Sequence, residues 1–458
     1  MPAASIQSVN PATGEVLEKF PVASAAQVLD AVARARGAQK SWVARPLSER
    51  KVVLASLARL IREREDFLER ALTEEQGKVL RESRWEVPDA AVRIDYFVSA
   101  AEEASAPEEG VVPARFRFKN IRKPLGVVGA VKPWNFPFTI PLWSIAPAIL
   151  LGNAVVFKPS EYTPRMGRLI GELFRDAGLP DGVLEIVQGG DDTGKAIVAS
   201  DVEMISFVGS QAAGKHIMRA SADHLRKLAL ELGGKDPMVV CADADFDAAV
   251  TGAVLGAFRN AGQVCCSAER IFVESAIFDR FLDAAVAKTC ALRIGPGLDE
   301  SSDMGPLISE EQKKRLVRHL EDSRKSCERV IEAGQTLPDR GFFAKPAVAV
   351  NPSETSLVLT EETFGPIMTL IRVRDAEEAI DRANRTMFGL TASVWTRDVE
   401  RGARLAERLE AGTVAVNQPV GSVAQCPWGG VKHSGIGRLL GIEGMREFTQ
   451  TVNLRTPL

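Results

Sequence analysis

The sequence predicts an α/β protein built around a doubly wound parallel sheet. Between residues 126 and 231, short apolar runs of β type alternate with helical patterns. The expected strands are Gly126–Val131, Ala154–Lys158, Val183–Val187, Met204–Val208 and Leu228–Glu231, and the helices between them are Ile140–Leu151, Thr163–Ala177, Thr193–Ala199 and Gln211–Ser221. Strands that are apolar throughout and alternate with helices are typical of a parallel sheet covered on both faces. Such sheets bind ligands at the carboxyl ends of their strands.

The composition narrows the class of protein. A chain of 458 residues with 45% hydrophobic and 26% charged residues is typical of a soluble globular protein with two or three lobes. The net charge of -3, without runs of one sign, argues against nucleic acid or a membrane surface as partner. No apolar run is long enough to span a bilayer, and the segment 1–6 lacks the features of a signal peptide. Six scattered cysteines and four distant histidines predict neither a disulfide framework nor a metal site, so we expect a cytoplasmic, metal-free protein.

The remaining elements follow from the same periodicities. Helices are expected at Ala25–Ala38, at Ser48–Glu75 with Ser48 as its N-cap, and at Arg84–Ala104, and their charges are interpreted as solvated faces. The alternation in Phe116–Arg122 predicts an edge strand. A second α/β lobe is predicted from helices at Asp247–Arg259, Ile277–Thr289 and Glu310–Lys325 and from strands at Ile271–Val273, Thr391–Trp395 and Thr413–Val416.

Chemically distinctive residues follow several of the predicted strands. Lys132-Pro133-Trp134-Asn135-Phe136-Pro137 comes after Val131, Lys158-Pro159-Ser160-Glu161 after Phe157, Gly209-Ser210 after Val208, and Glu231-Leu232-Gly233-Gly234-Lys235 after Leu230. Further along, Gly262-Gln263-Val264-Cys265-Cys266 places two cysteines before a strand. Alone, such a pair is more often two buried small side chains than a reactive site.

Two glycine-rich stretches resemble nucleotide motifs but fail in detail. Residues 209–215 nearly form a phosphate-binding loop, yet His216 stands where Ser or Thr is required. Gly435-Ile436-Gly437 begins a dinucleotide fingerprint, but Leu440 occupies the place of the third glycine and no strand precedes the stretch. Neither motif is therefore assigned a function.

Taken together and in order, the motifs resemble those of the aldehyde dehydrogenase superfamily, of the non-acylating type, from about Ser8 to Leu454. The matching stretches also include Gly214, Glu361-Glu362-Thr363-Phe364-Gly365-Pro366 and Pro427-Trp428-Gly429-Gly430-Val431-Lys432-His433-Ser434-Gly435. The resemblance implies a Rossmann-like cofactor domain (1–109 and 124–231), a catalytic domain (232–423) and a small β oligomerisation arm (110–123 and 424–458). It also implies a homodimer or homotetramer.

The resemblance implies a covalent mechanism. Cys265 would attack the aldehyde carbon, and Asn135 with the backbone N–H of Cys265 would stabilise the oxyanion. Hydride transfer to a nicotinamide would leave a thioester, and Glu231 would activate the water that releases the acid. Cys266 is expected to shape the pocket and not to react.

The cofactor-binding residues implied by the resemblance lie mainly at strand ends. They are Val131, Lys132, Pro133, Trp134, Lys158, Pro159, Ser160, Glu161, Gly209, Ser210, Gly214, Leu232, Glu362 and Phe364. The Glu161 carboxylate can accept hydrogen bonds from the ribose hydroxyls but would repel a 2′-phosphate, which favours NAD, with NADP as the alternative.

Three departures from the family pattern concern proton handling. Val208 replaces a usual Thr, Ser144 stands where many relatives carry Lys, and Gln450 stands where some carry a carboxylate. All three increase the expected dependence on Glu231.

The expected substrate pocket is apolar. It comprises Phe136, Ile140, Trp143, Val264, Cys266 and Trp428, with the loop 418–426, and contains no Arg or Lys. This favours a medium aliphatic or aromatic aldehyde over a semialdehyde acid.

Three alternative functions are weighed against these residues. A CoA-acylating dehydrogenase often lacks the carboxylate found here at Glu231, and a non-enzymatic relative would have lost Cys265, Glu231 or Asn135. An NTPase is disfavoured by His216.

Overall fold

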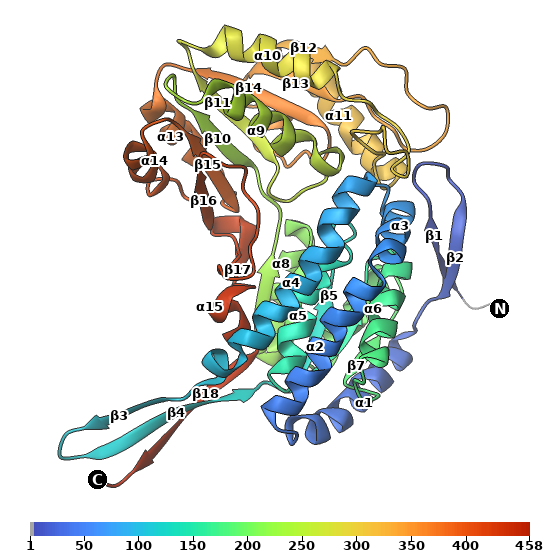
Figure 1. Ribbon diagram of the computed structural model, residues 1–458, viewed down its shortest axis with the longest axis vertical. Coiled ribbons are helices and arrows are strands. Elements are labelled where there is room, and N and C mark those ends of the chain that lie inside the picture. Colours follow the sequence, from blue (N-terminus) through green and yellow to red (C-terminus); the bar gives the residue numbers. More distant parts are fainter. Residues whose placement is uncertain (1–3) are drawn as a thin grey trace.

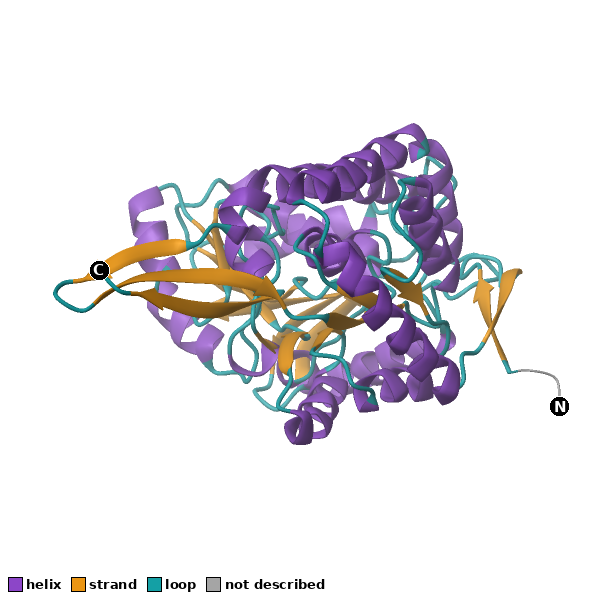
Figure 2. Cartoon of the chain, turned by 90° about the horizontal axis from the view of Figure 1, so that it is seen from below, coloured by secondary structure: helices purple, strands orange, loops and turns teal. Residues whose placement is uncertain are grey.

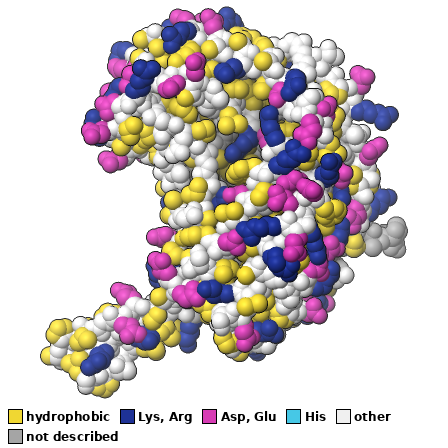
Figure 3. Space-filling model, in the orientation of Figure 1, with side chains coloured by type: hydrophobic (Ala, Val, Ile, Leu, Met, Phe, Trp, Pro, Cys, Tyr) yellow, Lys and Arg dark blue, Asp and Glu magenta, His cyan; other side chains and the backbone are white. Residues whose placement is uncertain are grey.

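The computed structural model describes residues 4–458, so residues 1–3, which begin both the predicted cofactor domain and the segment without signal-peptide features, lie outside the described part. Two α/β lobes lie one above the other in Figure 1, and a thin β arm projects from the lower lobe. Lys/Arg and Asp/Glu side chains are interspersed over the face shown in Figure 3, as expected from the nearly balanced charge.

The lower lobe contains the predicted doubly wound sheet. Its six strands have the order β17-β9-β8-β5-β6-β7 and are parallel except for β17. They are β5 (Val127–Val131), β6 (Ala154–Lys158), β7 (Leu184–Ile186), β8 (Met204–Val208), β9 (Lys227–Glu231) and β17 (Gly435–Ile436). The accompanying helices are α1 (Ala25–Val43), α5 (Thr139–Leu150), α6 (Pro164–Asp176), α7 (Asp191–Ala199) and α8 (Gln211–Ser221). The α/β prediction is confirmed, and β17 shows that the C-terminal segment returns to pair with this sheet.

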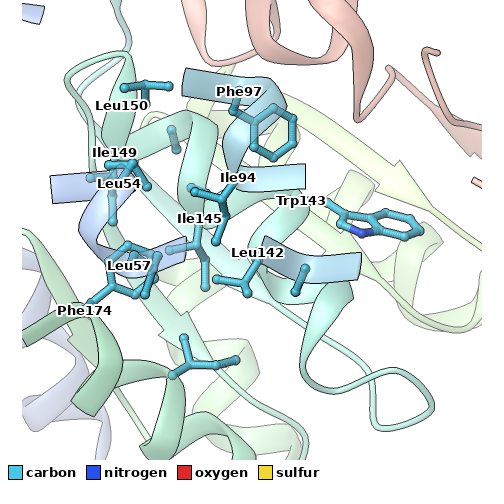
Figure 4. Packing of buried hydrophobic residues seen from close by; sticks show 14 of the residues in the cluster. Leu54, Leu57, Ile94, Phe97, Leu142, Trp143, Ile145, Ile149, Leu150 and Phe174 are labelled. Atoms are coloured by element: carbon cyan, nitrogen blue, oxygen red, sulfur yellow. The ribbon is translucent and has the colours of Figure 1, made fainter. Parts of the chain in front are cut away.

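Three further helices pack over the α5 face of this sheet. They are α2 (Leu47–Glu63), α3 (Glu65–Gln76) and α4 (Leu80–Ser105), and Figure 4 shows Leu54, Leu57, Ile94 and Phe97 meeting the α5 side chains Leu142 and Ile145. The expected single helix over Ser48–Glu75 is wrong, because Arg64 leaves helical geometry (φ -111°, ψ 17°) and divides it. Ser48 is also not the N-cap, since the helix begins after Pro46.

A hairpin precedes these helices. Strands β1 (Ser5–Val9) and β2 (Val16–Pro21) pair antiparallel at the edge of the molecule, as Figure 2 shows. The sequence analysis did not predict this hairpin.

The upper lobe is organised on a seven-stranded sheet. Its order is β12-β13-β14-β11-β10-β15-β16, with only β12 antiparallel to its neighbour. The strands are β10 (Asp236–Val240), β11 (Ala268–Glu274), β12 (Cys327–Glu332), β13 (Ala347–Pro352), β14 (Ile367–Val373), β15 (Thr391–Trp395) and β16 (Thr413–Val416). The helices are α9 (Phe246–Phe258), α10 (Phe278–Cys290), α11 (Glu310–Ser326), α12 (Leu357–Thr360), α13 (Ala376–Asn384) and α14 (Val399–Ala406). The lobe is therefore α/β as predicted, although β10, β12, β13 and β14 were not among the expected strands.

The arm is a three-stranded antiparallel sheet. It joins β3 (Glu108–Val112), β4 (Phe116–Pro124) and β18 (Thr449–Thr456), and α15 (Gly441–Arg446) precedes its last strand. Figure 1 shows it extending away from both lobes, with the C-terminus at its side. Among residues 4–458, no helix combines the length and the apolar character that crossing a bilayer requires.

Candidate active site

A cavity of about 130 Å³ opens at the carboxyl ends of the six-stranded sheet, where the two lobes meet. It is lined from the lower lobe by Pro133, Trp134, Asn135, Val208, Gly209, Ser210, Glu231 and Leu232, and from the rest of the chain by Gly233, Cys265, Gln312, Arg315, Glu362 and Phe364. The three predicted catalytic residues therefore share one cavity with many of the predicted cofactor residues. Residues 4–458 hold no cluster of His, Cys, Asp and Glu placed to bind a metal ion.

The loop that carries Cys265 has an unusual backbone. Asn260, Ala261 and Gly262 are consecutive residues with positive φ, at 51°, 54° and 72°. At Gly262 an added Cβ would lie 2.3 Å from the Gly365 carbonyl oxygen, so only glycine fits there. Non-glycine residues in this region persist only when surrounding contacts hold them.

Those contacts come from the amide side chains of the loop itself. Asn260 Nδ2 donates to the Asn135 carbonyl at 3.0 Å, and Gln263 Nε2 donates to the Asn260 carbonyl at 3.0 Å. Gln263 Oε1 accepts from the Ile308 backbone N–H at 2.9 Å, and Glu82 accepts from that of Asn260 at 2.8 Å. The loop is thus fastened to both lobes.

Several hydrogen bonds also fix the position of Asn135. Its Nδ2 donates to the Gln263 carbonyl at 3.1 Å, which leaves the second N–H of the amide for a ligand oxygen in the cavity. The backbone carbonyl of Asn135 also accepts a hydrogen bond from Lys78 Nζ at 2.8 Å. Lys78 pairs with Glu86 at 2.6 Å, and the other oxygen of Glu86 accepts the backbone N–H groups of Phe138 and Thr139.

These contacts correct the interpretation of the N-terminal helices. The side chains of Lys78 and Glu86 are fully buried, and Glu75 and Arg93 are buried as well. The charges of this region were expected on solvated faces, but Lys78 and Glu86 hold the Asn135 turn from within the protein. Glu86 was missed because helical spacing alone does not show which face of a helix is covered, whereas Lys78, Glu82 and Asn260 lie outside the helices that the sequence predicts.

The two adjacent thiols have different surroundings. Cys265 lines the cavity with Asn135 and Glu231, whereas Cys266 lines a smaller cavity of about 40 Å³ with Arg259, Val264 and Val420. A hydrogen bond between the thiols raises the pKa of Cys265 and lowers that of Cys266 to about 7, and the charge of Arg259 adds to the second effect. One of the two adjacent thiols can therefore be ionised near neutral pH. Position in the cavity, and not thiol acidity, distinguishes Cys265.

Glu231 ends β9 and is 3% exposed. Neither of its carboxylate oxygens has a hydrogen-bond partner among the described residues. Burial raises its pKa well above the ordinary value, while the charges of Arg438 and Lys132 oppose that rise. Such a group can accept a proton under mild conditions, which is what a general base requires.

The far wall of the cavity comes from the loop before β14. Glu362 accepts from the Gly234 backbone N–H at 3.1 Å, and burial raises its pKa to about 7. The Phe364 ring meets the Trp134 ring edge-on at 5.4 Å. Buried Glu269 holds this loop by accepting the backbone N–H of Thr363 at 2.8 Å and pairing with Lys235.

The other predicted cofactor residues lie around the sheet edge next to the cavity. Lys158 Nζ lies 3.1 Å from Glu161, whose side chain is partly exposed, and Pro159 and Ser160 between them are buried. Ser210 caps α8 by accepting from the Ala213 backbone N–H, and an added Cβ at Gly214 would lie 2.7 Å from Leu232. Val131 ends β5, and Lys132 after it is buried and does not line the cavity.

The predicted substrate residues gather beyond the thiols. Phe136, Ile140, Trp143, Val264 and Trp428 belong to one buried cluster, against which Cys266 packs. Trp143 and Trp428 meet edge-on at 6.1 Å, and Figure 4 shows Trp143 apart from the other α5 side chains.

The absence of a basic residue from this region was predicted and is wrong. The Arg259 guanidinium lies 5.7 Å from the centre of the Phe136 ring, and its charge lowers the pKa of Cys266. Arg259 stands six residues before Cys265, but this proximity along the chain does not show that its side chain reaches the Phe136 ring. Arg259 was interpreted as the end of a helix.

Comparison with known proteins accords with this geometry. Residues 2–454 match the model of the aldehyde dehydrogenase family. A protein from Sinorhizobium fredii named as a probable succinate-semialdehyde dehydrogenase (NADP+) is 38% identical over 96% of this chain and 90% of its own length. A betaine aldehyde dehydrogenase from Rhizobium leguminosarum is 37% identical over 97% of this chain and 92% of its own length. The crystal structure of a betaine aldehyde dehydrogenase from Staphylococcus aureus with NAD+ superposes with a TM-score of 0.95 at 32% identity, covering 99% of this chain and 91% of that one. With the cysteine, amide and carboxylate sharing one cavity, these matches show that the chain belongs to the aldehyde dehydrogenase family.

Proposed function

We propose that the protein oxidises an aldehyde to its carboxylic acid with NAD(P)+ through a thioester on Cys265. The observation that carries this is the shared cavity of Cys265, Asn135 and Glu231. The nicotinamide cofactor would accept the hydride. The residues fit it, because Ser210 opens a helix whose N-terminus favours a pyrophosphate, and Glu362 and Phe364 border the cavity.

The protein residues have separate tasks in this scheme. The Cys265 thiolate attacks the carbonyl carbon, and the free N–H of Asn135 with the backbone N–H of Cys265 stabilises the oxyanion. After hydride transfer, Glu231 takes a proton from the water that attacks the thioester. NADH formation that depends on aldehyde, with the acid as product in the absence of CoA, is the direct test.

We propose NAD as the preferred cofactor, with NADP as the alternative. The Glu161 carboxylate is partly exposed beside Lys158, placed to receive ribose hydroxyls and to repel a 2′-phosphate. The relatives include both a protein named for NADP+ and one solved with NAD+. We expect the KM for NAD+ to be lower than the KM for NADP+, and Glu161→Gln should narrow this difference in KM. A lower KM for NADP+ in the unmodified enzyme would contradict the assignment.

We propose a small aldehyde bearing a carboxylate as the substrate, in place of the aliphatic or aromatic aldehyde expected from the sequence. The Arg259 guanidinium borders Phe136 and Cys266, where the distal end of a substrate bound at Cys265 would lie. Arg93, over the Trp143 ring, is neutralised by Asp89, whereas Arg259 lines the same small cavity as Cys266. A trimethylammonium aldehyde would be repelled by Arg259.

A matched panel tests this proposal. Succinate semialdehyde, butanal and betaine aldehyde are similar in size and differ in charge. We expect the highest kcat/KM for the semialdehyde, and Arg259→Met should lower that value by about tenfold or more, the usual loss for a charge-assisted contact, while leaving butanal nearly unchanged. An equal loss for both substrates, or the highest value for betaine aldehyde, would exclude a carboxylate contact at Arg259.

We further propose that the arm pairs with another subunit to give a homodimer or homotetramer. We also propose the domain bounds given above: a cofactor domain (1–109 and 124–231), a catalytic domain (232–423) and the arm (110–123 and 424–458). Val111 and Leu454 are about half exposed on this arm, which is unusual for an isolated strand surface. The mass in solution, and its change on removal of residues 449–458, tests this.

A further inference from the structure

Lys132 is the first residue after β5, and its side chain is 2% exposed. Its Nζ donates to the Ser206 hydroxyl at 2.8 Å. A buried ammonium needs further compensation for the lost solvent, and one neutral hydroxyl does not supply it. The ammonium therefore requires a second partner.

The strand register identifies that partner. Ala130 pairs with Ser206, and Ser206 pairs with Ala229, so these residues share one face of the sheet. Two residues further on, Lys132, Val208 and Glu231 lie on the same face at the ends of three adjacent strands. Glu231 is two strands away from Lys132, about 10 Å in all, but the bond to Ser206 already places the Lys132 Nζ over the middle strand, β8, about one strand spacing of 4.8 Å from β9. Val208, between the two, has no polar group that could intervene.

The charges agree with this placement. The Glu231 carboxylate raises the pKa of Lys132 against the effect of burial, which leaves it at about 7. Lys132 and Arg438 are the two cations that lower the pKa of Glu231. Arg438 comes from the C-terminal segment and donates to the carbonyls of Gly430 and Gly437. Among residues 4–458, Lys132 donates to the Ser206 hydroxyl and to no carbonyl, so its ammonium is the freer of the two to respond to Glu231.

We propose that Lys132 is a positioning residue for Glu231, holding the carboxylate ionised and near the end of β9 until water attacks the thioester. The proposal rests on the proposed function of Glu231. Val208, Ser144 and Gln450 lack the polar groups that relatives carry at these positions for proton handling. In this chain the buried cation that follows β5 would act on Glu231 instead. The cation acts through Glu231 and touches neither the aldehyde nor the cofactor.

The test uses Lys132→Met in the full-length enzyme, followed by NADH release over a range of pH. Removing the cation raises the pKa of Glu231, so a larger fraction of the base is protonated at a given pH. We expect the acid limb of the kcat profile to move upward by about one pH unit, with roughly tenfold slower turnover below it. The first turnover of NADH formation should remain near the wild-type rate, because Lys132 acts after hydride transfer. Unchanged pH dependence would overturn the proposal.

Two further variants exclude a purely structural effect. In the Glu231→Gln background, Lys132→Met should cause no additional loss of kcat, whereas a loss of the same size as in the wild type would overturn the proposal. Ser206→Ala leaves the ammonium in place but removes its anchor, so the acid limb should shift in the same direction by a smaller amount. If Lys132→Met does not fold, an unshifted profile in Ser206→Ala overturns the proposal. Aldehyde-dependent NADH formation that survives Cys265→Ala would refute the proposed function itself, separately from Lys132.

Discussion

The loop of Cys265 and the carboxylate of Glu231 face the same cavity but are held in opposite ways. Hydrogen bonds from Asn260 Nδ2 to the Asn135 backbone carbonyl and from Asn135 Nδ2 to the Gln263 carbonyl join the cysteine loop to the Asn135 turn, and Lys78 donates to the same Asn135 carbonyl. Neither oxygen of Glu231 accepts a hydrogen bond among residues 4–458. One side of the site is fixed by direct contacts, and the other is governed by burial and by nearby charge.

The difference suits the two tasks. Attack on a carbonyl needs the sulfur and the oxyanion donors within a narrow geometry, which rigid contacts provide. A base that serves a later step must leave room for hydride transfer and then approach a water, and hydrogen bonds to its oxygens would both restrain it and lower its basicity. The contrast therefore predicts different consequences for mutations on the two sides.

The largest effect should come from the nucleophile itself. Cys265→Ala should abolish aldehyde-dependent NADH formation, since no thiohemiacetal can form in the cavity. Cys266→Ala should keep most of the activity, because that sulfur faces the smaller cavity with Arg259. The measurement is NADH release by both variants under the same conditions. The reverse pattern would mean that the more acidic thiol, Cys266, is the nucleophile.

Replacing the base should be the next largest effect. Glu231→Gln should lower kcat by about two orders of magnitude or more, the usual contribution of a general base. Because the folded state raises the pKa of Glu231, wild-type activity should be lost as the pH falls through that value and be retained above it. The variant should melt close to the wild type, because Lys132, whose pKa is about 7, can release its proton once the Glu231 carboxylate is removed. A large loss of thermal stability would contradict the contrast between the two sides.

The residues that act in the proposed chemistry were predictable because each stands in a short local motif. Asn135 lies in a turn between two prolines, and Glu231 and Cys265 are followed or preceded by glycines. Strand-helix alternation likewise predicted the sheet that places these motifs together, and the observed strands β5, β6 and β8 start within one residue of the predicted starts.

The supporting residues could not be predicted because their role depends on tertiary packing. Glu86 looks like an ordinary charge of an amphipathic helix, and Lys78 like a loop charge, until α4 is seen to lie against the Asn135 turn. Arg64 ends α2 without a glycine or proline, so no composition signal marked the break. Arg259 at the end of α9 became a pocket residue only once the Phe136 ring was placed beneath it.

Removing a contact that holds the Asn135 turn should lower the stability of the protein as well as its turnover rate. Glu86→Gln leaves the Lys78 ammonium buried without its anion, which should lower the free energy of unfolding by about 3 kcal/mol. The activity should fall with it, because the backbone N–H groups of Phe138 and Thr139 lose a charged acceptor. Thermal melting and kcat of the same preparation measure both.

Glu49→Gln provides the matched control for that variant. Glu49 lies in the first turn of α2 and is exposed at the helix end. Its replacement should change the melting temperature little and leave kcat unaltered. If Glu86→Gln behaves like this control, then the buried pair does not position Asn135.

The smallest expected effect concerns backbone strain in the cysteine loop. Ala261 has a φ of 54°, a conformation that costs a residue with a side chain about 1–2 kcal/mol, and glycine would remove that cost. Glycine also loses more entropy on folding, by roughly 0.5–1 kcal/mol, so Ala261→Gly should raise the free energy of unfolding by no more than about 1.5 kcal/mol. Turnover should stay within about threefold of wild type, since hydrogen bonds from Asn260 and Gln263 hold the loop in either case. A tenfold fall in kcat at unchanged melting temperature would show that the methyl group and its strain, and not those hydrogen bonds, place the Cys265 sulfur.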